Sequence, residues 1–273
     1  WLFSKHPFRW TPDSKEIVFT REHAVSAGKR THDFYLIDIK TKKERKTGSK
    51  EIVIPDGIIG VSPDGNKIYF TDSLSLYEHN LTDGDIESIY RDQRGWEIEA
   101  IISPDNSKML LYLNEGWWGG KTTPTRYEVG LFNLSNRDYK KIIQSDSNKI
   151  NLSKPKLFLH RSPKIIISLT DDKKVSTIKA IDWNTLEQKD LTKKDIKDFT
   201  SEYLRIISVS DDDKILIYST YSKESGYSYF VLNLEGGDSK QISVEKLYII
   251  ENTDFGGITD VAGVVGWITA GSQ

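Results

Sequence analysis

Short apolar stretches alternate with polar turns along most of the chain. The stretches read IVF, KIYF, MLLY, IIIS and ILIY, and they are rich in β-branched and aromatic residues. Stretches this short are typical of β-strands, because an amphipathic helix needs a longer segment with a period near 3.6 residues. The pattern therefore predicts an all-β protein built from many short strands.

A similar polar turn leads into each of five apolar stretches. Its copies are TPDSKEI, SPDGNKI, SPDNSKM, SPKIII and SDDDKIL, which begin at Thr11, Ser62, Ser103, Ser162 and Ser210. In the second copy Pro63 presets the φ angle of a type I turn, and Gly65 accepts a positive φ angle. The position near Gly65 is taken by Ser14, Asn106 and Asp213 in other copies. We expect each copy to be the hairpin turn between two strands, and the alternative for SDDDK is an Asp cluster that holds a cation.

Each copy of the turn belongs to a longer unit. After the apolar stretch comes a variable loop, then a third segment such as FYLIDI or YFVLNL, and then a polar turn and a short fourth segment. The unit recurs at roughly 40 to 60 residues, which is the range of four-stranded β-propeller blades. We place the blades at about 6–50, 51–95, 96–149, 150–198, 199–246, and 247–273 together with 1–5.

The repeated turn resembles that of a known family. TPDSK, SPDGNK and SPDNSK, each followed by apolar strand residues, resemble the WD40-like or PD40 repeat of TolB-type β-propellers, over residues 8 to about 243. The resemblance implies one propeller domain over 1–273, with six blades of four antiparallel strands and a last blade completed from the N-terminal segment. Units four and five depart from the pattern, because SPK lacks the Asp-Gly half and SDDD lacks the Pro. This class includes binding domains, scaffolds and a few enzymes, so the resemblance predicts architecture, with a lean towards the cell envelope.

Composition excludes several partners and chemistries. The chain has 273 residues, of which 38 are Lys or Arg and 40 are Asp or Glu, so its net charge of -2 gives no electrostatic reason to expect nucleic acid. No apolar run approaches the roughly 18 residues of a membrane helix, so we expect no membrane insertion. The absence of cysteine excludes disulfides and thiolate metal sites. The chain begins with Trp1 and not Met, so we expect that an N-terminal piece has been removed.

The segments between second and third strands differ from blade to blade. Blade one has REHAVSAGKRTHD, blade three NEGWWGGKTTPTRYE and blade five YSKESGYS, whereas blades two and four have shorter loops. In a propeller these loops share one face, and long individual loops on a rigid scaffold are where binding residues gather. The candidate binding residues are therefore Arg21, His23, Arg30, His32, Trp117, Trp118, Lys121, Arg126, Tyr221, Glu224 and Tyr227.

Two groups among these residues suggest specific chemistry. Trp117 and Trp118 lie between glycines and charges, where they suit stacking on a sugar ring or a peptide side chain; the alternative is that one of them plugs the central channel. The densest polar group comprises Arg21, Glu22, His23, Arg30, His32 and Asp33. One alternative for it is a divalent metal held by His23 and His32 with Glu22 or Asp33.

The sequence favours binding over catalysis. It contains no P-loop, HExxH or EF-hand loop, and GYSYF lacks the second Gly of a nucleophile elbow. We therefore predict a non-catalytic propeller, without cofactor or resident metal, that recognises a protein, peptide or glycan through the loops of blades one, three and five. One alternative is a metal-assisted lyase or hydrolase of an acidic saccharide that uses His23, His32, Arg30 and Arg126. Another is an accessory propeller of a larger envelope protein or peptidase.

Overall fold

The computed structural model describes residues 8–26, 29–51, 57–72, 74–115, 126–146, 150–171, 176–191, 203–222 and 226–242. Every regular element within these ranges is a β-strand. The described residues accordingly include no helix with the length and apolar character needed to cross a membrane.

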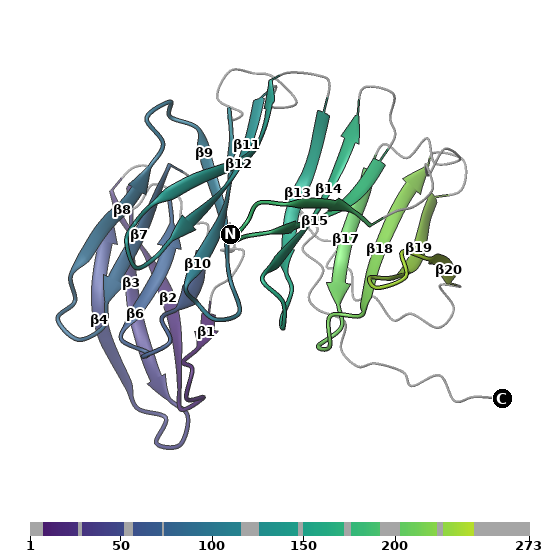
Figure 1. The fold of residues 1–273 in the computed structure, drawn as a ribbon. Coiled ribbons are helices and arrows are strands. Elements are labelled where there is room, and N and C mark those ends of the chain that lie inside the picture. Colours follow the sequence, from purple (N-terminus) through teal and green to yellow (C-terminus); the bar gives the residue numbers. More distant parts are fainter. Residues whose placement is uncertain are drawn as a thin grey trace. The chain divides into compact units, whose positions relative to one another are not determined.

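The strands form five antiparallel sheets of four, and neighbouring strands of a sheet follow one another along the chain (Figure 1). Sheet one contains β1 (Phe8–Trp10), β2 (Glu16–Ser26), β3 (Lys29–Asp38) and β4 (Glu44–Glu51). Sheet two contains β5 (Gly57–Val61), β6 (Lys67–Thr71), β7 (Ser75–Asn80) and β8 (Ile86–Arg91). Sheet three contains β9 (Glu97–Ile102), β10 (Lys108–Asn114), β11 (Arg126–Asn133) and β12 (Tyr139–Asp146).

The remaining two sheets have the same order. Sheet four contains β13 (Ile150–Phe158), β14 (Lys164–Asp171), β15 (Ser176–Asp182) and β16 (Gln188–Asp190). Sheet five contains β17 (Tyr203–Val209), β18 (Ile215–Ser222), β19 (Gly226–Asn233) and β20 (Ser239–Ile242). The all-β class and the four-stranded antiparallel unit expected from the sequence are confirmed.

The chain divides into two compact units, Trp1–Ser147 and Asn148–Gln273. Sheets one to three belong to the first unit and sheets four and five to the second. The sixth blade predicted for 247–273 with 1–5 lies outside the described residues.

The first turn of a sheet has the conformation that its sequence predicts. In sheet two the carbonyl of Ser62 accepts a hydrogen bond from the Gly65 amide at 2.9 Å, and the Asp64 carboxylate accepts one from the Asn66 amide at 3.1 Å. The Ser62 hydroxyl oxygen accepts a third, from the Lys67 amide at 2.9 Å. The same three contacts recur in the turns that begin at Thr11, Ser103 and Ser210. The predicted positive φ angles are confirmed, at 57° for Ser14, 73° for Gly65, 52° for Asn106 and 61° for Asp213.

A second turn joins the third and fourth strands of every sheet. In sheet three the Asn133 carbonyl accepts a hydrogen bond from the Arg137 amide at 2.9 Å, and the Asn133 side chain accepts one from the Ser135 amide at 2.9 Å. The two turns of a sheet are bonded to each other, because the amide of Leu134 donates to the carbonyl of Ser107 at 3.1 Å. Equivalent bonds run from Ile39 to Lys15, Leu81 to Asn66, Trp183 to Pro163 and Leu234 to Lys214. We call this end of each sheet the turn end, and the opposite end the hairpin end.

The sequence predicted that the first turn of sheet four begins at Ser162, and this prediction is wrong. The Leu159 amide donates to the Lys164 carbonyl at 2.9 Å, the same bond that the Ser62 amide makes with Lys67 at 2.8 Å. Leu159 therefore occupies the place of Ser62, and Ser162 the place of Gly65. The letters SPK resemble the repeat, but they are displaced by three residues along the turn.

Asp213 of sheet five supplies the carboxylate that this turn lacks. Its Oδ1 accepts a hydrogen bond from the His160 amide at 2.7 Å, and its Oδ2 accepts from the amides of Arg161 at 2.7 Å and Ser162 at 2.9 Å. Asp212 meanwhile closes its own turn through the Lys214 amide. Turn closure thus accounts for these carboxylates of SDDDK without a cation.

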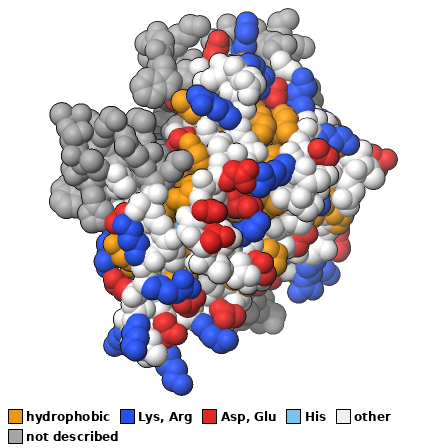
Figure 2. Space-filling view, turned by 90° about the vertical axis from the view of Figure 1, so that its left-hand side faces the viewer, with side chains coloured by type: hydrophobic (Ala, Val, Ile, Leu, Met, Phe, Trp, Pro, Cys, Tyr) orange, Lys and Arg blue, Asp and Glu red, His pale blue; other side chains and the backbone are white. Residues whose placement is uncertain are grey.

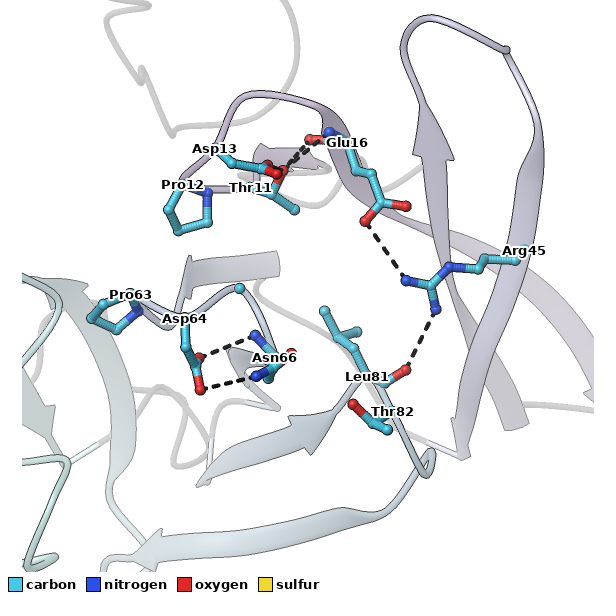
Figure 3. Close-up of a pocket in the computed structure, with 11 residues that line it drawn as sticks. Thr11, Pro12, Asp13, Glu16, Arg45, Pro63, Asp64, Asn66, Leu81 and Thr82 are labelled. Atoms are coloured by element: carbon cyan, nitrogen blue, oxygen red, sulfur yellow. Dashed lines mark hydrogen bonds and ion pairs between the residues drawn. The ribbon is translucent and has the colours of Figure 1, made fainter.

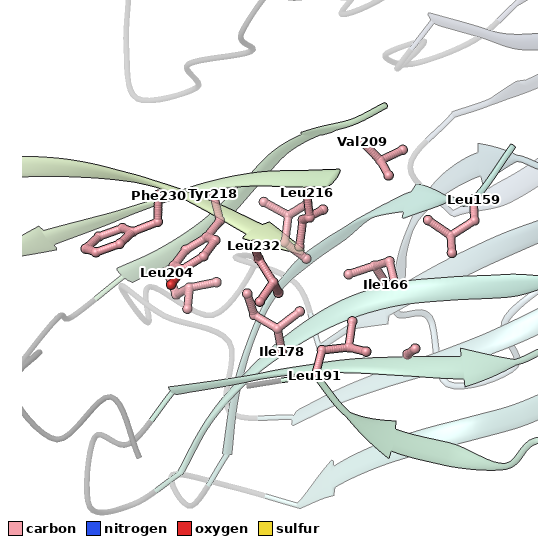
Figure 4. Close-up of a cluster of buried hydrophobic side chains, with 12 residues drawn as sticks. Leu159, Ile166, Ile178, Leu191, Leu204, Val209, Leu216, Tyr218, Phe230 and Leu232 are labelled. Carbon is pink, nitrogen blue, oxygen red and sulfur yellow. The ribbon is translucent and has the colours of Figure 1, made fainter. Parts of the chain in front are cut away.

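Apolar side chains fill the spaces between neighbouring sheets within each unit. Between sheets four and five they form one buried cluster from β14, β15 and the strands of sheet five, which includes Ile166, Ile178, Leu216, Phe230 and Leu232 (Figure 4). Two further clusters lie between sheets one and two and between sheets two and three. Since burying one Leu, Ile or Phe side chain stabilises a fold by about 1.5–3 kcal/mol, this packing is the main stabilising contribution.

One polar side chain is fully buried between sheets one and two. His79 is 0% exposed, and its Nε2 lies 3.0 Å from the Thr47 hydroxyl while its Nδ1 lies 3.2 Å from the Asp85 carbonyl. Gly48 leaves room for the ring, because a Cβ there would meet His79 Cε1 at 2.6 Å. Burial lowers the pKa of His79, so the neutral ring is favoured in the folded state.

We expect this histidine to make stability depend on pH. The unfolded chain binds the His79 proton with an ordinary pKa near 6.5, and the folded chain binds it with a lower pKa. Stability is therefore complete above about pH 6.5 and falls as the pH decreases towards the folded pKa. Urea unfolding at several pH values should show a smaller pH slope for His79→Gln than for the wild type. The matched His160→Gln variant, at an exposed site, should keep the wild-type slope, and an unchanged slope in His79→Gln would contradict the assignment.

Candidate functional site

The blade-one segment REHAVSAGKRTHD is a β-hairpin and not the long loop expected from its sequence. β2 continues to Ser26 and β3 begins at Lys29, so only residues 27–28 join them. β1 pairs only with Ile17–Phe19, so the outer part of the hairpin has no third strand on that side among the described residues. On the other side β4 pairs with β3 as far as Thr31, so within the described residues only the tip, residues 24–26 and 29–30, is two-stranded.

Arg21 lies on the described part of this hairpin and is exposed. Its guanidinium carbon is 5.1 Å from the ring centre of Phe19 and 4.7 Å from that of Tyr35, and these two rings stack at 5.5 Å. Its Nη2 donates to Glu44 Oε1 at 2.8 Å. The Arg21 side chain is 45% exposed, so its guanidinium is accessible to solvent while Glu44 and the two aromatic rings hold it in place.

The two histidines of the hairpin are not placed together. The strand register pairs Glu22 with His32 and His23 with Thr31. Because successive residues of a strand alternate between faces, positions 23 and 32 belong to opposite faces. His32 is buried, while the side chains of His23 and Arg30 lie outside the described part. In the described residues no group of three His, Cys, Asp or Glu could hold a metal ion.

The other predicted residues lie in sheets three and five. Trp117, Trp118, Lys121 and Glu224 fall outside the described residues. Arg126 is exposed and begins β11, where its carbonyl accepts a hydrogen bond from the Glu115 amide at 3.2 Å. Tyr221 of β18 pairs with Tyr227 of β19, so the expected blade-five loop is also a strand hairpin joined by residues 223–225. Tyr227 is 54% exposed.

The hairpin ends differ from sheet to sheet, whereas the turn ends are alike. The second and third strands are joined by residues 27–28, 72–74, 115–125, 172–175 and 223–225. The connection of sheet three is the longest, and those of sheets two and four are short, as the sequence predicted; the long loops predicted for blades one and five are instead strands of a hairpin. The variation in length among the described sheets therefore lies at their hairpin ends.

The connection between sheets two and three contains a polar cluster that the sequence did not reveal. Arg94, between β8 and β9, donates from Nη2 to Asp92 Oδ2 at 2.6 Å and from Nη1 to Glu128 Oε2 at 2.9 Å. Its guanidinium carbon lies 3.9 Å from the ring centre of Trp96, and the Tyr139 hydroxyl donates to Glu128 Oε1 at 2.6 Å. We call these five residues the Arg94 cluster. Its one signal in the sequence is an Arg two residues from an Asp and two from a Trp in a short connection.

Two groups of the Arg94 cluster have shifted pKa values. Hydrogen bonds with Asp92 raise the pKa of Arg94. Burial, together with the hydrogen bond to Glu128, raises the pKa of Tyr139. The arginine therefore stays charged and the tyrosine stays protonated at neutral pH, and their hydrogen bonds fix the connection between β8 and β9.

A polar groove separates the turn ends of sheets one and two (Figure 3). It measures about 470 Å³, and its rim carries Pro12 and Pro63 from the two first turns. Arg45 spans it, with Nη2 3.6 Å from Glu16 Oε2 and Nη1 3.5 Å from the Leu81 carbonyl. Asp13 and Asp64 are engaged by their own turns, and these hydrogen bonds lower the pKa of both carboxyls. The groove is therefore lined by more carboxylates than cations, and two of the three carboxylates are held by their own turns.

Known structures of the same architecture cover most of the chain. The chain is similar to dipeptidyl peptidase 4 from Porphyromonas gingivalis, with a TM-score of 0.59 at 11% identity, over 89% of this chain and 40% of that one. A putative TolB from Agrobacterium tumefaciens gives 0.52 at 12% identity, over 86% and 79%. TolB from Acinetobacter baumannii gives 0.49 at 20%, over 85% and 52%. No protein-family model and no curated protein matches the sequence.

The fold is a TolB-like β-propeller. The chain spans about half the length of the Acinetobacter baumannii TolB and 40% of the dipeptidyl peptidase. At these identities the similarity establishes the fold and leaves the activity open.

The described surface of the propeller has charges of both signs in close alternation. Figure 2 shows Lys and Arg side chains interspersed with Asp and Glu over one face, with hydrophobic side chains between them. Many of the carboxylates contact an amide or a cation, such as Glu87 with Arg137 at 2.7 Å and Glu78 with Lys67 at 2.8 Å.

Proposed function

We propose that the chain is a non-catalytic propeller that binds a protein, a peptide or a glycan through the hairpin ends of its sheets. The contrast between the two ends of the sheets supports this function most strongly. The second turn recurs with the same backbone hydrogen bond in the five described sheets and the first turn recurs with the same hydrogen bonds in four of them, whereas the hairpin ends carry connections of different length and sequence. Rigid scaffolds with variable connections at one end commonly place their binding residues there.

The chemistry of the hairpin ends supports recognition. Arg21 presents a cation held above Phe19 and Tyr35, and Tyr227 exposes an aromatic ring at the corresponding end of sheet five. The connection 115–125 of sheet three contains Trp117 and Trp118. Arginine and large aromatic residues are the side chains that most often dominate binding energy, because they bury a large area and also offer a polar or charged group.

The accessory-domain hypothesis has one observation in its favour. The chain covers 40% of the dipeptidyl peptidase and 36% of a puromycin hydrolase, both of which are larger proteins. We propose the cell envelope as the place of binding, on the resemblance to TolB. The sequence of the full gene product tests the first point, and fractionation of the native protein tests the second.

Replacing both Trp117 and Trp118 with Ala should abolish binding at the hairpin end. The test is to screen the immobilised protein against peptide and glycan arrays and to measure the resulting ligands by calorimetry. We expect the double variant to lose at least tenfold in affinity, since each stacked aromatic contributes on the order of 1–2 kcal/mol. Its thermal midpoint should remain within a few degrees of the wild type.

Ile39→Ala is the matched control, because Ile39 is an exposed apolar side chain at the turn end. It should retain the wild-type affinity. Undiminished binding by the double tryptophan variant would contradict the proposal.

A further inference from the structure

Sheet one repeats the apolar face through which sheet two packs against it. In both sheets the strand pairing and the turn hydrogen bonds define equivalent positions, and six of these positions carry an aliphatic or aromatic residue in each sheet. The six pairs, with the sheet-one residue first, are Phe8 and Ile58, Trp10 and Val61, Ile17 and Ile68, Phe19 and Phe70, Tyr35 and Tyr77, and Ile39 and Leu81. In sheet two these residues belong to or pack against the buried cluster that is shared with sheet one. We call the six residues of sheet one the open face.

The open face is exposed where its counterpart in sheet two is buried. Phe8 is 52% exposed and Trp10 is 50% exposed, whereas Ile58 is 0% and Val61 5% exposed. None of the three buried clusters of the described residues includes the open face. With Ile39, it contains three of the five large hydrophobic side chains that are exposed in the described part of the chain. Exposed apolar side chains gathered in this way mark an interaction surface.

Ion pairs lie along the outer edge of the open face. Lys46 contacts Asp33 at 2.9 Å, and Arg21 contacts Glu44 at 2.8 Å. The strand register pairs Lys46 with Tyr35, so positions 44 and 46 are on the same side of the sheet as the open face. The edge thus contains two cations and two carboxylates and has no net charge. An apolar centre with a polar edge is the usual anatomy of a protein interface.

We infer that the open face binds the open face of a second copy of this chain. A twofold axis places the apolar centre of one copy against that of the other, and the paired charges of the two edges meet with neither sign in excess. The surface is therefore complementary to itself, as a twofold contact requires. The second copy covers the open face by sheet-on-sheet packing, which is the contact that sheets one and two already make through their apolar faces.

The available area predicts a weak dimer. An aromatic side chain can bury about 150–250 Å², so Phe8 and Trp10, half exposed, still offer about 100 Å² each. With the rest of the open face and its edge, two copies bury roughly 1,000–1,200 Å² in total, which is the lower limit for a specific interface. We therefore expect a dimer that dissociates on dilution. The contact does not depend on the recognition function proposed for the hairpin ends.

Sedimentation velocity from low to high micromolar concentration tests this contact. The wild type should change from monomer to dimer as the concentration rises. Phe8→Ser/Trp10→Ser should raise the dissociation constant at least tenfold, because buried aromatic side chains dominate such contacts. Ile215→Ser is the matched control, since Ile215 is an exposed apolar side chain of sheet five, and it should dimerise as the wild type does.

A single thiol on the open face shows what covers it. The chain has no cysteine, so Ile17→Cys introduces the only one, at a half-buried position opposite Trp10. A maleimide should label this thiol quickly at low protein concentration and slowly at high concentration, where the second copy covers it. Slow labelling at every concentration would show that another part of the same chain covers the face, and fast labelling at every concentration would show that nothing does.

Either of these labelling results would overturn the inference. A wild type that stays monomeric over the whole range would also overturn it, as would undiminished dimerisation of Phe8→Ser/Trp10→Ser. An equal loss of dimer in Ile215→Ser would place the contact elsewhere and count against the open face.

Discussion

Replacing Glu128 with Ala should lower the free energy of unfolding by about 3 kcal/mol. Glu128 is buried and accepts hydrogen bonds from both Arg94 and Tyr139. Its removal leaves the tyrosine hydroxyl without this acceptor and the arginine with only Asp92. The loss stays at the lower end of the range for a broken buried pair, because the Arg94 side chain is 37% exposed and water can reach part of it.

Glu87→Ala is the matched control for this prediction. Glu87 also binds an arginine, Arg137 of sheet three, through two hydrogen bonds of 2.7 Å, but its side chain is 58% exposed. Its loss should therefore cost no more than about 1 kcal/mol. Urea unfolding of both variants measures the difference, and equal losses would show that the Arg94 cluster is not a buried pair.

Replacing Asp213 with Gly should cost about 2 kcal/mol, although this residue closes no turn of its own with its side chain. The carboxylate accepts hydrogen bonds from three consecutive amides of sheet four, those of His160, Arg161 and Ser162. Glycine keeps the positive φ angle of 61° free of strain, so the variant isolates the loss of the carboxylate.

Asn106→Gly is the matched control, because Asn106 has the same turn position in sheet three, with a φ angle of 52°. Its unfolding free energy should change by no more than about 0.5 kcal/mol. Amide hydrogen exchange adds a local measurement, since the amides of residues 160–162 should exchange faster in Asp213→Gly and not in Asn106→Gly. Unchanged protection of these amides would contradict the bond across the two sheets.

The sequence predicts the repeated unit because its information is local. A carboxylate two residues, and a hydroxyl five residues, before the amide that it caps produce the same turn wherever they occur, so SPDG and its variants specify four first turns without help from the rest of the chain. The apolar stretches then define the strands on either side. Ser14, which fits a positive φ angle less well than Gly65 does, still adopts one because the Thr11–Asp13 framework closes the turn around it.

Prediction from local sequence fails where the residue that fixes a turn or a cluster is distant in the sequence. The first turn of sheet four is capped by the carboxylate of Asp213 in sheet five. Its own sequence therefore predicts the start of the turn three residues too late. The blade-one and blade-five segments become hairpins because cross-strand pairing compensates for a polar sequence that has no apolar face. The Arg94 cluster depends on Glu128, which lies 34 residues from Arg94 and looks like an ordinary strand carboxylate. Such contacts are set by packing between sheets and have no local signature.

Candidate sites were predictable to a more limited extent. Arg21 and Tyr227 are exposed, as residues of a binding surface must be, and the connection of sheet three is the longest between second and third strands, as its sequence predicted. The pairing of His23 with Thr31 could not be foreseen, because register across a hairpin depends on where its turn closes.

The carboxylate shared between sheets four and five also sets an order of events during synthesis. Asp213 follows Ser162 by 51 residues, so the ribosome adds it roughly 3 to 10 s after the turn that it completes. Until then the emerging amides of that turn have water as their partner. The first turn of sheet four is therefore completed only after Asp213 has been synthesised, and a chain released before that point would lack these three hydrogen bonds.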